Sequence, residues 1–108
     1  ALNMQRRYTE SERLLLEELA IIDATRLQRS AQHGHVLAEL AYVQFAQRRL
    51  GEGERYLEAV SAFATELPAA QQEGVAELFK AYAHLLRGVK RNRDAARIEG
   101  RANSLLAR

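Results

Sequence analysis

The feature that most constrains this chain is a ten-residue string that occurs twice and returns a third time in weaker form. RRYTESERLL at 6–15 is followed by RRLGEGERYL at 48–57, 42 residues later, and by KRNRDAARI at 90–98 after 42 more. All three copies place two basic residues, an acidic residue, a small residue, an arginine and a bulky apolar residue in the same register. Such a fixed period is typical of arrays in which each helical unit packs on its neighbours.

Length and composition limit the chain to one folded domain. It has 108 residues, 47% of them hydrophobic and 28% charged, and no cysteine. This balance is too apolar for intrinsic disorder. The absence of cysteine excludes disulfides and thiolate metal sites. No apolar run is long enough to span a bilayer, so we expect a cytoplasmic chain. The first residue is not methionine and no secretory signal follows, which indicates a sequence that begins at an internal cut.

Apolar residues recur at helical spacing along most of the chain, and no segment alternates at the period of a strand. The predicted class is therefore all-α, with about five helices that short turns join into antiparallel hairpins. The expected helices cover about 9–31, 36–50, 52–67, 68–87 and a last segment from residue 92.

Capping and turn residues place the ends of these helices. Thr9 and Asn92 are expected as N-caps, and Pro68 suits the first turn of a helix. Gly34 is expected to close the first helix in the left-handed conformation, within a turn at 32–35. Three further glycines are expected at later turns: Gly51, Gly53 and Gly88.

Within the repeat, large and small apolar residues follow a spacing known from tetratricopeptide repeats: Leu37-x-x-Leu40-Ala41 with Gly53-x-x-x-Leu57, and Phe79-x-x-Tyr82-Ala83 with Ala95. The chain resembles that family, and its period resembles the long variant found in kinesin light chain. Gln44 and Leu86 depart from the family, since tyrosine usually stands there. The nine residues expected to pack the helical hairpins are Leu37, Leu40, Ala41, Gly53, Leu57, Phe79, Tyr82, Ala83 and Ala95.

The resemblance implies an architecture and a function. Hairpins would stack as a short right-handed solenoid with a half unit at 1–34, a full unit at 35–67 and a unit with a capping helix at 68–108. The first helix of each full unit would line a concave groove that holds a peptide or helix of a partner protein, and an acidic or carboxylate-bearing ligand would suit its cations. The groove residues would be His35, Tyr42, Arg49, Lys80, His84, Arg87 and Arg91. The alternative is that they form a solvated basic face.

Two other functions remain open at this stage. The C-terminal end is basic, and Arg91, Arg93, Arg97 and Arg101 would suit contact with nucleic acid. An open half unit at the N-terminus would also expose apolar surface, which predicts self-association or adjoining repeats of a longer bacterial repeat or regulatory protein.

Enzymatic chemistry is not expected. The serines have no neighbouring histidine and acid, and no glycine-rich phosphate loop occurs. His33 and His35 have the spacing of some metal ligands, but no third ligand lies near them in the sequence. We therefore predict no catalytic residues, no metal and no cofactor.

Overall fold

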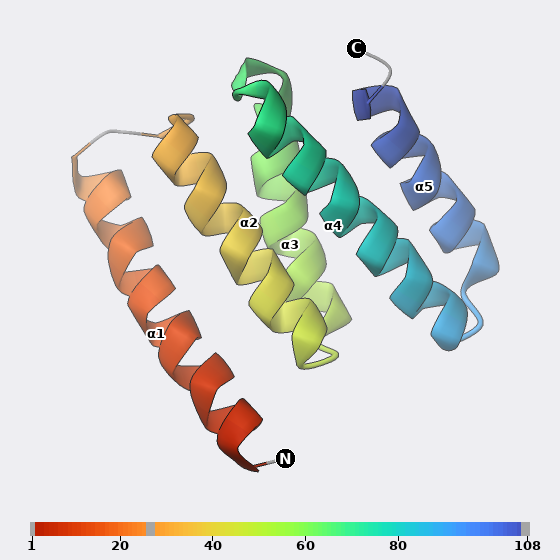
Figure 1. Ribbon diagram of the computed structural model, residues 1–108, viewed down its shortest axis with the longest axis horizontal. Coiled ribbons are helices and arrows are strands. Elements are labelled where there is room, and N and C mark those ends of the chain that lie inside the picture. The colour runs from red at the N-terminus through yellow and green to blue at the C-terminus, as the bar shows by residue number, and fades with distance from the viewer. Residues whose placement is uncertain (1, 26–27, 107–108) are drawn as a thin grey trace.

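The computed structural model describes residues 2–25 and 28–106. Within these residues the chain forms α-helices and one short 3-10 helix, and no strand (Figure 1). The elements are α1 (Leu2–Ala24), α2 (Ala31–Ala46), α3 (Leu50–Ser61), η1 (Ala64–Glu66), α4 (Ala69–Gly88) and α5 (Asn92–Leu106). The predicted all-α class is confirmed.

Successive helices run antiparallel and pack in pairs. Figure 1 shows α1, α2, α4 and α5 side by side, with α3 behind α2 and α4. The most extensive contacts join α2 to α3 and α4 to α5, while α2 and α3 both pack on α4. α1 packs mainly on α2 and forms one edge of the molecule. The extents of 39 × 39 × 19 Å fit a slab two helices thick, since one helix with its side chains is ~10 Å across.

The first turn between helices lies earlier than predicted. Thr9 does not cap α1, because it lies inside the helix and its hydroxyl donates to the carbonyl of Gln5 at 3.0 Å. α1 ends at Ala24, and part of the predicted continuation, residues 26–27, lies outside the described residues. The predicted turn at 32–35 is wrong: α2 begins at Ala31, where the Ser30 hydroxyl accepts from the backbone N–H of His33 at 3.1 Å.

Arginine and lysine take the left-handed conformation at the turns, in place of the glycines. The backbone φ angles are 66° at Arg29, 63° at Arg48 and 63° at Lys90, whereas no glycine has a positive φ. Gly34 and the two glycines at 51 and 53 lie inside helices, so their assignment to turns is wrong. Arg48 and Lys90 stand 42 residues apart, at corresponding positions of the repeat.

The segment between α3 and α4 also differs from the prediction. α3 ends at Ser61 instead of continuing to residue 67, and η1 follows it. Pro68 precedes α4 in an extended conformation with ψ of 151°, one residue before the position expected. The Gln72 side chain closes the turn, because its Nε2 donates to the carbonyl of Leu67 at 2.8 Å. α5 begins at Asn92, close to its expected start.

The core depends on close contact between α2, α3 and α4. The Phe45 ring stacks on the Tyr82 ring, with centroids 5.0 Å apart and planes 11° apart. A Cβ atom at Gly53 would lie 2.3 Å from Cε1 of Phe45, so α3 approaches this ring through a position without a side chain. All nine residues expected at the hairpin interfaces are buried. Among them, Ala83 and Ala95 are 0% exposed, as small residues between closely packed helices require.

Two glycines of α3 give a direct test of this contact. Gly53→Ala is expected to lower the free energy of unfolding by about 1–3 kcal/mol, because Phe45 is held against Tyr82 and cannot move aside. Gly51→Ala meets nothing within 4 Å and is expected to raise it by up to ~1 kcal/mol through helix propensity. Urea unfolding of both variants measures the difference, and equal effects would contradict the proposed contact.

Candidate binding surface around Tyr42

A groove runs between α2 and α4, with Tyr42 at its centre. Two hollows of about 270 and 480 Å³ meet there and share Tyr42 and Leu78. Tyr42 is 54% exposed, although the residues on either side of it in the sequence are buried. We call this surface the Tyr42 groove. Its walls include His35, Ala38, Glu39, Tyr42 and Ala46 from α2 and Gln71, Gly74, Leu78, Ala81, His84 and Leu85 from α4.

Small residues on α4 keep this groove open. Gly74 and Ala81 flank Leu78, one turn before and one turn after it, and a Cβ atom at Gly74 would meet nothing within 4 Å. The charged groups at the walls are few. Glu39 lines the 270 Å³ hollow together with His35, and Arg48 lines the 480 Å³ hollow together with His84. The surface is therefore mainly apolar and can take up apolar side chains of a partner.

Three of the seven groove residues expected from the sequence line this groove: His35, Tyr42 and His84. The four cations of that set form ion pairs within the chain instead. Arg49 pairs with Glu12, Lys80 with Glu77, Arg87 with Glu99 and Arg91 with Asp94. None of them lines either hollow, so the walls of the groove are less basic than expected.

Sequence reasoning identified His84 on the α4 wall but missed the rest of that wall and Arg48. Gln71, Gly74, Leu78, Ala81 and Leu85 recur every three or four residues, which places them on one face of α4. That spacing was visible in the sequence, but it did not show which face of α4 points away from the core.

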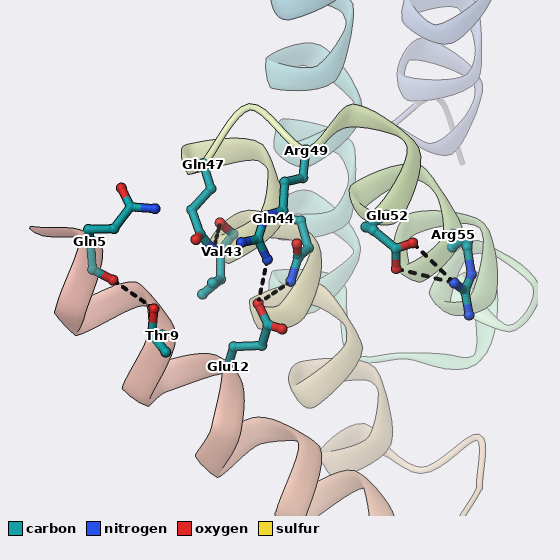
Figure 2. Close-up of polar contacts among 9 residues, drawn as sticks. All are labelled: Gln5, Thr9, Glu12, Val43, Gln44, Gln47, Arg49, Glu52 and Arg55. Carbon is teal, nitrogen blue, oxygen red and sulfur yellow. Dashed lines mark hydrogen bonds and ion pairs between the residues drawn. The ribbon is translucent and has the colours of Figure 1, made fainter.

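An inter-helix junction holds α1 against the other side of α2 (Figure 2). Glu12 reaches from α1 and accepts a hydrogen bond from Nε2 of Gln44 at 2.6 Å. The same carboxylate oxygen lies 3.4 Å from Nη1 of Arg49, the residue before α3. One carboxylate thus joins the first copy of the repeated string to the start of the second copy.

Gln44 makes this junction costly to disturb. It is 2% exposed, and its Oε1 accepts no hydrogen bond from the described residues. An unsatisfied buried polar group costs about 1–3 kcal/mol. Among the described residues, Glu12 is the one hydrogen-bond partner of the Gln44 side chain, so Gln44 depends on it. The corresponding position in the next unit is Leu86, which is 0% exposed and needs no partner.

Burial affects the pKa values of two tyrosines near this surface. Burial raises the pKa of Tyr82 to about 12, and the Glu54 carboxylate adds to the rise. Burial also raises the pKa of Tyr56, with further contributions from Glu52 and Glu12. Both hydroxyls therefore stay neutral throughout the physiological range and act as structural groups of the core.

The basic C-terminal end folds partly back onto the protein. Arg101 pairs with Glu58, donates to the Ser61 hydroxyl at 3.0 Å and lies over the Phe79 ring at 4.8 Å. Arg91 pairs with Asp94, as described above. Of the four arginines that could contact nucleic acid, only Arg93 and Arg97 have no ion pair with the residues that the structure describes.

The two histidines of the His-x-His sequence have separate surroundings. Nδ1 of His33 accepts from the backbone N–H of Arg29 at 2.8 Å, and its ring stacks on Phe63. His35 is exposed on the Tyr42 groove. Residues 2–25 and 28–106 contain no group of three or more side chains that could hold a metal ion. The helices of the same residues include none that is long and apolar enough to cross a membrane.

No protein-family model, curated protein or solved structure matches this chain. The functional inference therefore depends on the repeat and on the surfaces described above.

The raised pKa of Tyr82 predicts a loss of stability at alkaline pH. Because the folded state holds the hydroxyl proton more tightly than the unfolded state, this contribution is complete below pH ~10 and is lost as the pH rises through ~12. The free energy of unfolding of the wild type is expected to fall by up to about 2–3 kcal/mol more than that of Tyr82→Phe over this interval. Urea unfolding from pH 8 to 12 tests this, and parallel pH profiles would refute it.

The Glu12–Gln44 pair makes a second prediction. Glu12→Ala is expected to lower the free energy of unfolding by about 1–3 kcal/mol, because it leaves the buried Gln44 amide without a partner. Adding Gln44→Leu is expected to recover most of that loss, since Leu86 already fills the equivalent position. Thermal and urea unfolding of the single and double variants measure both steps. A double variant no more stable than Glu12→Ala would show that Gln44 does not carry the cost.

Proposed function

We propose that the chain is a short tetratricopeptide-like array of right-handed stacked hairpins. Support comes from the pairing of α2 with α3 and of α4 with α5, and from the contact of each first helix with the next. The 42-residue register supports the same arrangement, because Arg48 and Lys90 adopt the same left-handed conformation at corresponding turns. Ala41 and Ala83, also 42 residues apart, are both 0% exposed.

We further propose that the Tyr42 groove binds a peptide or helix of a partner protein. The observation that carries this proposal is the 54% exposure of Tyr42, an aromatic side chain between two hollows that α2 and α4 line. Tyrosines of this kind contribute strongly to protein interfaces because they bury a large rigid area at low entropic cost. The two hollows adjoin at Tyr42 and Leu78, and such a pair of neighbouring hollows suits a continuous segment of a partner.

The chemistry of the walls defines the segment that would fit. Apolar side chains would pack on Tyr42, Leu78 and Leu85, and Gly74 and Ala81 leave room for them. A basic residue of the partner would lie near Glu39, and a carboxylate near Arg48. An acidic ligand held by Lys80, Arg87 and Arg91 is less well supported, because each of these cations already has a carboxylate partner in the chain.

Matched alanine substitutions test the groove. A displayed peptide library is selected on the wild-type chain, and the selected peptides are measured by fluorescence anisotropy against Ala81→Glu and Ala59→Glu. Both alanines are exposed within helices, but Ala81 lines the groove whereas Ala59 lies on α3. Ala81→Glu is expected to weaken binding at least ~10-fold, equivalent to ~1.4 kcal/mol, and Ala59→Glu to leave it unchanged.

The melting temperatures of both variants serve as a control, since each change should leave the fold intact. Peptides that bind both variants equally well would place the interaction elsewhere on the surface. Failure to select any peptide would contradict a peptide-binding function.

A further inference from the structure

α1 has two apolar faces, of which the packing against α2 uses only one. Ile22 is 1% exposed and forms a cluster with Val36 and Leu40 of α2, against which Leu15 and Leu19 also pack. A second stripe lies beside this face, and its residues are alternately three and four positions apart in the sequence. It consists of Met4, Arg7, Ser11, Leu14, Glu18 and Ile21.

The apolar members of the second stripe are largely uncovered. Met4 is 48% exposed, Leu14 is 54% exposed and Ile21 is 62% exposed. Leu14 and Ile21 border a hollow of about 570 Å³ between α1 and α2, which His35, Glu39 and Tyr42 of α2 also line. The alternating spacing is that of the a and d positions of a coiled coil, so this stripe is shaped to receive another helix.

The charges on the stripe select an occupant. In an antiparallel pair of two α1 helices related by a two-fold axis, Arg7 lies opposite Glu18 of the second copy. Met4 then lies opposite Ile21, and Ser11 opposite Leu14. Each of these three facing pairs forms one layer of the interface. Every layer recurs on the other side of the two-fold axis, because the symmetry makes each contact occur twice. Every layer thus joins opposite charges, two apolar side chains, or an apolar and a small side chain.

The other simple arrangements are less favourable. A parallel pair would place Arg7 opposite Arg7 and Glu18 opposite Glu18, and like charges in such positions repel. Moving the antiparallel pair by one heptad would bring Leu14 opposite Glu18 and would leave Met4 without a facing residue. Of these three arrangements, only the first antiparallel register gives each of the six stripe residues a facing residue of compatible charge or polarity.

We propose that the chain forms a two-fold symmetric dimer through antiparallel pairing of α1 with α1 of a second copy. The hollow beside this interface is also lined by His35, Glu39 and Tyr42 of the proposed peptide site, so the two surfaces adjoin. The inference does not rest on the proposed function, because its tests change residues of α1 alone and measure dimerisation, so either proposal can fail alone.

Charge reversal tests the register. Sedimentation equilibrium over a dilution series is expected to show a reversible dimer for the wild type. Arg7→Glu and Glu18→Arg are each expected to raise the dimer dissociation constant at least ~10-fold, because each places like charges in two layers of the interface. The double variant Arg7→Glu/Glu18→Arg is expected to restore the dimer. A monomeric wild type at every concentration, or a double variant weaker than either single one, would overturn the proposal.

Two exposed leucines of α1 provide a matched control. Leu14→Glu is expected to abolish the dimer, whereas Leu16→Glu should retain it, since Leu16 is 41% exposed but lies on the opposite side of the helix from the stripe. Helical content measured by circular dichroism should be the same for both variants. Equal loss of the dimer in both, or in neither, would remove Leu14 from the interface and overturn the proposal.

Cross-linking separates the two helix directions, because the chain has no cysteine of its own. A mixture of Met4→Cys and Ile21→Cys chains is expected to form a disulfide between the two chains, and neither variant alone should form one. In the antiparallel pair, two copies of position 4 lie ~25 Å apart along the helix, far beyond the ~7 Å limit for Cα atoms in a disulfide. Efficient cross-linking of each variant with itself would indicate parallel pairing and overturn the proposed register.

Discussion

The contact between Gly53 and the Phe45 ring determines how the helices of this protein are arranged. Because Gly53 has no side chain, α3 lies directly against the ring, and the ring can lie flat on Tyr82 of α4. One aromatic side chain therefore sets the separation of α2 from α3 and joins the first hairpin to the second. The outer faces of α2 and α4 form the Tyr42 groove, so the shape of that surface depends on a contact in the core beneath it.

The sequence predicted the buried residues well and the turns poorly. Small and large apolar residues at helical spacing identified interior positions such as Ala83 and Leu57, because burial follows directly from apolar pattern. The turns depend on backbone conformation, which tertiary contacts can override. A left-handed residue with a side chain costs roughly 1–2 kcal/mol, yet Arg48 and Lys90 adopt it while the glycines that favour it serve close packing or lie in helices.

For the candidate site, sequence reasoning identified Tyr42 and the histidines but not the role of the cations. The repeat placed Tyr42 on the first helix of a unit, where helical periodicity alone indicates exposure. The partner of Arg87 is Glu99 on α5, and the partner of Arg49 is Glu12 on α1. These pairs join α4 to α5 and the turn before α3 to α1, and local spacing carries no signal for them. Exposed pairs of this kind contribute only ~0–1 kcal/mol each, but they determine which charges remain available to a ligand.

The same pairs indicate why the two ends of the array differ. Glu12 in the first copy of the repeated string lies beside Arg49 in the turn of the next unit. A hydrogen bond to Asp94 raises the pKa of Arg91, and the Glu54 carboxylate of the second copy adds to the rise. The third copy has Ala96 at this position, so α5 offers no carboxylate to a further turn. α5 is therefore suited to end the array, whereas α1 keeps an exposed apolar stripe on which a second copy can pack.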